Sequence, residues 1–334
     1  MKANLIVIIL LVLKSINLVA QDYHFSQINS IPLLINPANT GNFTGDLRVL
    51  SNYRSQWQGV GDPYQTATFS TDFSILKNKL NYENKVAIGV AALFDKSSGG
   101  LLKSNHIAAS LAYHLFFDKT KINKLSFGFQ GSIINKIIDI QNVSFASQFS
   151  SNGFDLSIPS NQFFTGNQKS YFDLSAGLNF DHSQDDYSLS FGIGFYHLNN
   201  PVYSFLGVSN YNIPLRVNYS FGGSISLGIN DKLFGSVLYS QMSSESDALV
   251  GLMYAHDLSN SFHDIQFRIG SSFRVNESYI PYIGYVYDRM HIGFSYDIVN
   301  PYLINYSNTN RSLELSVGFQ LSDKSSIRKA IPWY

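Results

Sequence analysis

The chain has 334 residues, 23 basic and 23 acidic side chains, and no cysteine. Only 14% of its residues are charged, whereas 15% are aromatic and 45% hydrophobic, which excludes a disordered protein, since disorder requires high net charge and few aromatic residues. The balanced charge argues against nucleic-acid binding, and the lack of cysteine excludes disulfides, thiolate zinc sites and a cysteine nucleophile.

Residues 1–20 have the layout of a secretory signal peptide. An apolar run extends from Leu5 to Leu13, and Ala20 stands at the expected cleavage site before Gln21. The run is shorter than the roughly 20 residues that a membrane-spanning helix needs. We therefore expect this segment to be removed rather than to anchor the protein; the alternative is a short buried N-terminal helix.

Residues 21–45 are rich in Pro, Asn and Gly and lack the alternation of a strand. We expect them to lie outside the wall of any sheet that follows. If that sheet closes into a barrel, two placements remain open. The segment either folds into the lumen as a plug or lies below the barrel as a periplasmic docking segment.

From residue 46 onward, apolar and polar residues alternate with a period of two, which is typical of β-strands. The pattern is weak between Phe234 and Leu252, and Pro281 removes a backbone donor within another candidate strand. We count about fourteen segments, near 46–57, 64–75, 84–94, 103–117, 125–133, 172–180, 189–195, 217–225, 230–240, 246–257, 265–273, 278–288, 292–298 and 313–319.

A soluble all-β protein would also alternate, so alternation alone does not show whether these segments face water or lipid. The composition of their two faces does. In the clear segments the apolar face carries no charged residue at its centre, and a cation there would cost about 2–4 kcal/mol at the midplane of a bilayer. The opposite face is dominated by Ser, Gly, Asn and Gln, which suit a crowded lumen. Aromatic residues such as Tyr53 and Trp57 cluster near strand ends, as in an interfacial girdle.

The pattern therefore predicts an all-β protein, a transmembrane antiparallel β-barrel of about 14 strands over residues 46–322. An even number of strands places both termini on the periplasmic side, so we expect residues 323–334 to form a periplasmic C-terminal tail. The three longest connections, 138–168, 199–212 and 299–311, then all lie outside the cell. The first of them is rich in phenylalanine.

The chain shows no arrangement typical of catalysis. Its eight histidines lack metal-ligand spacing, and the acidic turn at 181–186 lacks the Gly and distal Glu of an EF-hand loop. We therefore predict no catalytic residue, no cofactor and no metal site. Charged residues on the lumen face form either a salt-bridged network that stiffens a narrow or plugged lumen, or a surface for a ligand or polypeptide; they are Arg54, Arg216, Arg268, Arg274, Asp173, Asp297 and Glu314.

Four short matches, in order along the chain, resemble motifs of the PorP/SprF family of type IX secretion system outer-membrane proteins. They contain Phe25, Ser26 and Gln27 with Asn36, Pro37 and Gly41; Tyr53, Arg54, Gln56 and Trp57; His197, Asn199 and Pro201; and the strand Ser312–Ser316 followed by Ile331 and Pro332. We take the residues of the first three matches as candidate family-motif or partner-binding residues. For Tyr53 and Trp57, simple anchoring at the membrane interface is an equal alternative.

The resemblance implies a non-enzymatic barrel in the outer membrane of a Gram-negative, Bacteroidetes-type bacterium. Such a barrel would assist the secretion or surface anchoring of large proteins with a C-terminal sorting domain, such as gliding adhesins. The implied partners are that secreted protein, periplasmic components of the secretion or peptidoglycan-anchoring apparatus, and outer-membrane lipid, with no nucleic acid. The alternative function is an outer-membrane diffusion channel or small-solute transporter.

Overall fold

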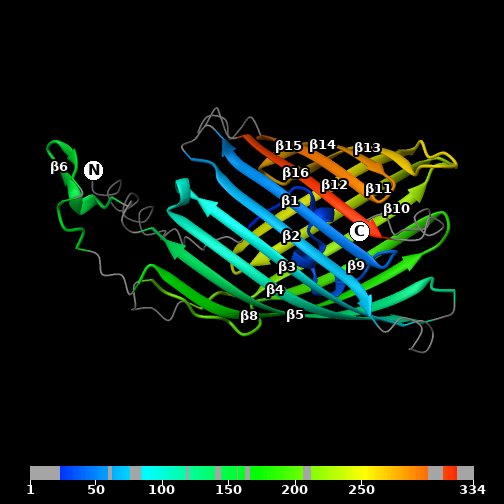
Figure 1. The fold of residues 1–334 in the computed structure, drawn as a ribbon, viewed down its shortest axis with the longest axis horizontal. Coiled ribbons are helices and arrows are strands. Elements are labelled where there is room, and N and C mark those ends of the chain that lie inside the picture. Colours follow the sequence, from blue (N-terminus) through cyan, green and yellow to red (C-terminus); the bar gives the residue numbers. More distant parts are fainter. Residues whose placement is uncertain are drawn as a thin grey trace, which may run out of the picture.

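The computed structural model describes residues 23–58, 62–75, 84–117, 120–139, 144–155, 157–161, 166–205, 212–299 and 311–321. The expected signal peptide (1–20) and C-terminal tail (323–334) lie outside these residues. Fourteen antiparallel strands close into a single barrel (Figure 1), which confirms the predicted all-β barrel. The strands are β1 (Leu47–Gln58), β2 (Tyr64–Ile75), β3 (Lys85–Ser97), β4 (Leu102–Phe116), β5 (Asn123–Ile138), β8 (Gln168–Ser183), β9 (Tyr187–Tyr196), β10 (Arg216–Ser226), β11 (Asp231–Met242), β12 (Glu245–Asp257), β13 (Ile265–Arg274), β14 (Ser278–Tyr287), β15 (Met290–Val299) and β16 (Arg311–Leu321).

Closure is made by the first and last strands, which pair from Leu47 with Leu321 to Ser55 with Leu313. Every other strand pairs with its neighbours in the chain, apart from the small hairpin between β5 and β8. Because the number of strands is even, β1 begins and β16 ends at the same end of the barrel. We call this the near end and the opposite one the far end.

The weakly alternating region also forms regular wall strands. β11 and β12 pair without interruption from Asp231 with His256 to Met242 with Glu245. The predicted effect of Pro281 is local: β14 pairs with β15 at Tyr279 and again from Tyr282, and the register between these two positions is unpaired. Alternation is thus a weaker guide than strand pairing, because a neighbouring ladder can hold a strand whose own pattern is imperfect.

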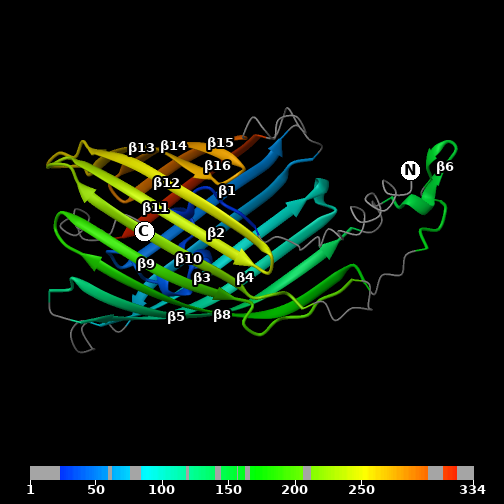
Figure 2. The ribbon, with the colours of Figure 1, turned by 180° about the vertical axis from the view of Figure 1, so that it is seen from behind.

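Figures 1 and 2 show the wall of the barrel from opposite sides, and strands all around it carry exposed apolar side chains on their outer face. Side chains that water-soluble proteins usually bury are 40–66% exposed there, among them Phe69, Val90, Ile107, Phe129, Phe172, Phe191, Phe221, Leu252, Ile269 and Phe294. Such a band is typical of a barrel that faces lipid. In the described part of the chain, no helix has the length and apolar character needed to cross a membrane.

The connections differ between the two ends. At the near end, β8–β9, β10–β11 and β14–β15 are joined by tight turns at 184–186, 227–230 and 288–289. The three longest connections, β5–β8, β9–β10 and β15–β16, all leave from the far end. The first includes a 3-10 turn, η6 (Ala146–Gln148), and a hairpin of β6 (Phe149–Ser150) and β7 (Gly153–Phe154), which lies apart from the wall (Figure 1).

Candidate functional site: a segment braced inside the barrel

Residues 23–46, which we call the lumen segment, run through the interior of the barrel before β1 begins (Figure 1). Three short turns shape the segment: η1 (Ile28–Ser30), α2 (Pro32–Ile35) and η2 (Pro37–Asn39). Proline at the first position of α2 and of η2 fixes a helical φ and needs no hydrogen-bond acceptor there. At the far end Tyr23 bonds His106 of β4 through its hydroxyl at 2.9 Å, and at the near end Asp46 joins Leu321 of β16.

The first anchor of this segment is a cluster of charges on the strands that close the barrel, and we call it the seam socket. Arg54 of β1 pairs with Asp297 of β15 at 2.6 Å and with Glu314 of β16 at 2.9 Å. All three side chains are at most 3% exposed. A buried charge is costly unless it is paired and hydrogen-bonded, so this cluster requires partners on every side.

The motif residues Ser26 and Gln27 supply those partners. Their backbone N–H groups donate to the two carboxylate oxygens of Glu314 at 2.7 and 3.0 Å. The Ser26 hydroxyl donates to Asp297 and accepts from Arg54. The Gln27 amide donates to the Glu314 carbonyl at 2.9 Å and accepts from Ser316 at 2.6 Å. The Phe-Ser-Gln motif is therefore held by side chains from the first strand of the barrel, β1, and from its last two strands, β15 and β16.

The second anchor is a row of glycines on the opposite wall, the glycine socket. Gly128 of β5, Gly177 of β8 and Gly194 of β9 are direct cross-strand neighbours. A Cβ atom at Gly128 would overlap the backbone of Pro37 and Ala38, and one at Gly177 would overlap the side chain of Asn36. The missing side chains therefore create the space in which the Asn-Pro-Ala motif lies.

Asn36 fixes the motif in this socket with both ends of its amide. Its Oδ1 accepts from the N–H of Ala38 at 2.9 Å and so caps η2. Its Nδ2 donates to the carbonyl of Leu178 in β8 at 2.8 Å. The side chain is 1% exposed. A short polar residue with both a donor and an acceptor is required here, because the cap and the wall must be satisfied together.

Gly41 ends the motif at a third buried contact. Its φ of +67° is one that residues with a side chain rarely adopt, and its N–H donates to Asp72 of β2 at 2.6 Å. Asp72 also forms a two-point ion pair with Arg48, with distances of 3.0 and 2.7 Å. Sequence reasoning missed Arg48 and Asp72. Arg48 could have been found, because it lies six positions before Arg54 on the same strand and therefore points to the same face of the sheet.

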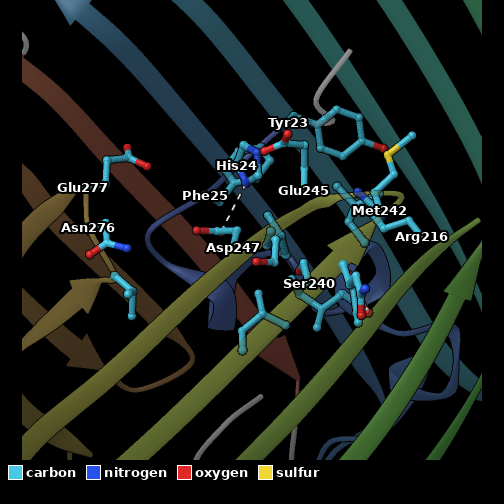
Figure 3. A pocket seen from close by; sticks show the side chains of 18 residues that line it. Tyr23, His24, Phe25, Arg216, Ser240, Met242, Glu245, Asp247, Asn276 and Glu277 are labelled. Carbon is cyan, nitrogen blue, oxygen red and sulfur yellow. Dashed lines mark hydrogen bonds and ion pairs between the residues drawn. The ribbon is translucent and has the colours of Figure 1, made fainter. Parts of the chain in front are cut away.

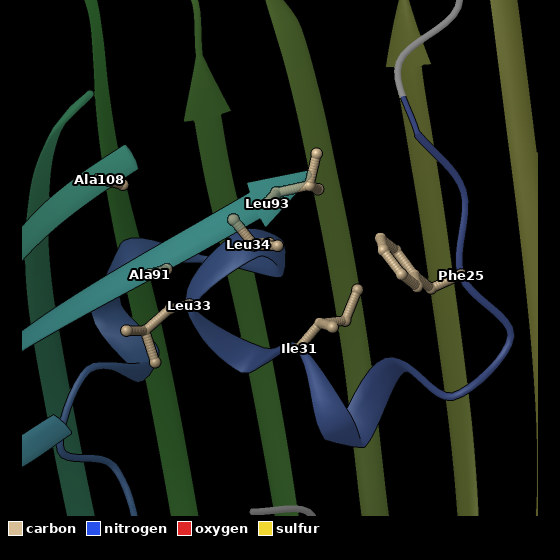
Figure 4. Packing of buried hydrophobic residues seen from close by; sticks show 7 residues of the cluster. All are labelled: Phe25, Ile31, Leu33, Leu34, Ala91, Leu93 and Ala108. Atoms are coloured by element: carbon tan, nitrogen blue, oxygen red, sulfur yellow. The ribbon is translucent and has the colours of Figure 1, made fainter. Parts of the chain in front are cut away.

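Apolar contacts fill the space between the polar anchors (Figure 4). Phe25, Ile31, Leu33 and Leu34 of the lumen segment are buried against inward residues of β3 and β4, namely Ala91, Leu93 and Ala108. Leu33 is fully buried and Leu34 is 5% exposed. The lumen segment thus has a small hydrophobic core of its own inside a barrel whose other inward residues are largely polar.

Of the motif residues in β1, Arg54 belongs to the seam socket, and the other three lie away from both sockets. Tyr53 and Trp57 point outward and are 40% and 53% exposed. The Trp57 ring lies 6.1 Å from that of Tyr64 across the β1–β2 ladder. Gln56 points inward and donates to the carbonyl of His24 at 3.5 Å, a weak contact.

The motif around His197 lies at the far edge of β8, where β9 has ended. His197 adopts a φ of +62° and bonds Asp173 of β8 at 3.0 Å. Asn199 accepts from the N–H of Leu174 at 3.0 Å and donates to the carbonyl of Phe172 at 2.8 Å. Its side chain therefore replaces the missing strand partner. Pro201 is buried nearby and accepts from the N–H of Ile213.

The far end holds a cavity of about 300 Å³, the far cavity, between the lumen segment, β10–β12 and the turn that joins β13 to β14 (Figure 3). Carboxylates of Glu245, Asp247 and Glu277 line it, and Asp247 pairs with His24 at 3.3 Å. Asp247 also pairs with Arg274, whose Nη2 donates to the carbonyl of Phe25 at 2.8 Å.

A second cavity of about 70 Å³, the near cavity, lies between the lumen segment and β11–β16. An apolar cluster stands between the two cavities; its members are Ile28, Ile35, Leu238, Leu249 and Ile280. Leu238 and Ile35 line the far cavity, whereas Ile28 and Ile280 line the near one. In the described part of the chain, no group of three or more His, Asp or Glu residues is placed to hold a metal ion.

Comparisons with known proteins identify a family from the sequence and similar barrels among solved structures. Residues 17–319 match the sequence profile of the type IX secretion system membrane protein PorP/SprF. No curated protein matches the chain. Among solved structures, the Pseudomonas putida toluene transporter TodX is similar with a TM-score of 0.54 at 9% identity, over 91% of this chain and 96% of TodX. A TodX deltaS2S3 mutant, described as a monoaromatic hydrocarbon channel, gives 0.50 at 10% identity, over 87% and 94% of the two chains. At these identities the likeness shows the fold alone.

Proposed function

We propose a function from one premise: the chain belongs to the PorP/SprF family of type IX secretion system membrane proteins. In this proposal it is a non-enzymatic barrel of the outer membrane of a Gram-negative bacterium. It assists the secretion or surface anchoring of large proteins that carry a C-terminal sorting domain, such as gliding adhesins. The near end, where β1 begins and β16 ends, faces the periplasm, and the far end faces outward.

The connection lengths support this orientation. Outer-membrane barrels have short periplasmic turns and longer extracellular loops, and the three longest connections, β5–β8, β9–β10 and β15–β16, all leave from the far end. In this proposed orientation residue 46 and the end of β16 face the periplasmic part of the secretion apparatus, which is the partner that we propose on that side.

The observation that carries the proposal is the braced lumen segment. The seam socket and the glycine socket hold it on opposite walls, and its apolar side chains pack between them. A barrel whose interior is occupied in this way is stiff and offers little free cross-section to a solute. This arrangement suits a scaffold for other proteins better than an open pore.

The far-end hairpin is the surface we propose for the secreted partner. Phe149 and Phe154 are 65% and 59% exposed, and their rings meet edge to face at 5.0 Å. The chain beside them is ordered by its own contacts, because the Ser157 hydroxyl and N–H donate to Asp155 and hold the pKa of that carboxyl below its usual value. Exposed, ordered aromatic side chains are frequent anchors in protein interfaces.

The test is to replace residues 140–166 by a short Gly-Ser linker in the cell and to follow the secreted partner. We expect the partner to move from the cell surface to the medium while the barrel stays in the outer membrane with heat-modifiable gel migration. The control replaces the turn at 243–244, also at the far end, by two glycines. Unchanged surface retention in the linker variant would contradict the proposed role of this loop.

A second candidate function is a diffusion channel or small-solute transporter, and the two cavities favour it. They lie on the same side of the lumen segment, and the apolar cluster of Ile28, Ile35, Leu238, Leu249 and Ile280 separates them. Hydrophobic constrictions can gate pores by excluding water. Planar bilayers distinguish the two functions, because a channel gives steady conductance whereas a braced scaffold is nearly silent.

A further inference from the structure

The near cavity differs in charge from the rest of the lumen. Its lining includes Arg268 of β13, His291 of β15 and Tyr282 of β14, and no carboxylate among the described residues. The far cavity, by contrast, is lined by the carboxylates of Glu245, Asp247 and Glu277 beside His24 and Arg216. A cavity lined by a cation and without acidic groups attracts anions, because its walls focus the positive potential.

Arg268 also differs from three other arginines that enter the lumen. Arg48, Arg54 and Arg274 each pair with a carboxylate at 2.9 Å or less. Arg268 donates through Nε to the neutral amide oxygen of Gln266 at 2.7 Å, and in the described part of the chain no carboxylate oxygen lies within ion-pair distance of it. The guanidinium has five N–H donors, so this hydrogen bond leaves most of them for another acceptor.

The side chain of Arg268 is accessible from the lumen. It is half-buried, whereas Arg48, Arg54 and Arg274 are 1% exposed. Its neighbours in sequence, Phe267 and Ile269, are the ones that point outward, so the exposed part of Arg268 faces the interior.

Hydroxyl groups complete the cavity. Ser236 and Ser272 flank Gly251 on the neighbouring strands, and a Cβ atom at Gly251 would lie 2.7 and 2.8 Å from their Oγ atoms. Tyr282 contributes a further hydroxyl. The volume of about 70 Å³ is several times the ~10–15 Å³ that a cavity needs to hold one water molecule. The cavity therefore has room for a small oxyanion but not for a folded ligand.

We propose that the near cavity binds one oxyanion, a carboxylate or a phosphate, with the Arg268 guanidinium as its charged ligand. The guanidinium fork matches the two oxygens of either group, and serine hydroxyls donate to the rest. The anion arrives free in solution or as the acidic side chain of a polypeptide. The site does not depend on the secretion role, because it rests on the lining of this cavity alone.

The experiment is calorimetric titration of the full mature chain in detergent with inorganic phosphate and with two peptides, acetyl-Gly-Glu-Gly-amide and its Gln counterpart. We expect saturable binding of phosphate or of the Glu peptide, weakened at least about tenfold by Arg268→Gln. Arg289→Gln is the matched control, because Arg289 lies exposed in the near-end turn, and it should leave binding unchanged.

The outcomes separate the sources of the anion. Binding of phosphate without the Glu peptide assigns the site to a free anion, and binding of the Glu peptide but not the Gln peptide assigns it to an acidic polypeptide. Absence of saturable binding by either, or equal affinities in the wild type and Arg268→Gln, overturns the proposal. If Arg268→Gln does not fold, crystals of the wild type soaked in selenate, a tetrahedral oxyanion, decide the question: an anomalous selenium peak beside Arg268 supports the proposal, and no peak there overturns it.

Discussion

Replacing Glu314 by alanine tests whether the lumen segment is braced as the contacts indicate. The carboxylate is fully buried and accepts hydrogen bonds from Ser26 N, Gln27 N, Asn52 Nδ2 and Arg54 Nη1 at 2.7–3.0 Å. Hydrogen bonds to a charged group contribute about 1.5–3 kcal/mol each, so about 6 kcal/mol is a lower gross value. Arg54 keeps Asp297 as a partner, which reduces the loss. We therefore expect the free energy of unfolding to fall by about 3–5 kcal/mol, as for other broken buried ion pairs.

The assay is urea unfolding of the protein in lipid vesicles, followed by tryptophan fluorescence. Glu277→Ala is the control, because Glu277 also faces an arginine, Arg274, but is 53% exposed at a distance of 3.7 Å. Exposed ion pairs contribute about 0–1 kcal/mol, so this variant should unfold like the wild type. A loss in Glu314→Ala no larger than that of the control would refute the view that the seam socket holds the lumen segment.

Three further outcomes follow from the geometry. Gly128→Val should cost about 1–3 kcal/mol of unfolding free energy by overpacking and expose the lumen segment to protease, whereas Gly235→Val should not, because no atom lies within 4 Å of a Cβ there; equal digestion of both would contradict the glycine socket. Phe129→Lys, at the centre of the outer face, should cost about 2–4 kcal/mol in a bilayer, whereas Phe149→Lys, equally exposed on the hairpin, should lose only its ring contact with Phe154, about 0.5–1.5 kcal/mol; two variants of equal cost would argue against lipid contact. Leu238→Ser should raise conductance in planar bilayers by wetting the apolar cluster, and an unchanged silent barrel would show that the cluster is not the barrier.

The wall of this protein could be predicted from its sequence because the signal is local. Strand alternation assigns each residue to a face over a few positions, and all fourteen expected segments overlap strands of the barrel. The same parity correctly pointed Arg54, Asp297 and Glu314 inward. Alternation along one strand says nothing about which strands are neighbours. It therefore could not show that these three side chains meet where the first and last strands pair.

The contacts of the lumen segment could not be predicted from the sequence for a related reason. The row of Gly128, Gly177 and Gly194 joins residues of three strands, and it gains meaning only when the strand registers align them. In one sequence each glycine is simply a small inward residue. Likewise, Asn36 has no local reason to be buried, since its partner Leu178 lies 142 residues away. Docking inside a barrel is set by long-range register, which a single sequence does not display.

The position of the seam socket couples the brace to the closure of the barrel. Its residues come from β1, β15 and β16, which meet only when the first and last strands pair. Before closure, Glu314 and Arg54 are not neighbours, so Ser26 and Gln27 have no complete site. Once the site exists, the lumen segment binds it and thereby stabilises the closed seam by linkage. Closure and docking of the segment are therefore mutually dependent, and a variant that weakens the socket should open the barrel at the β1–β16 ladder first.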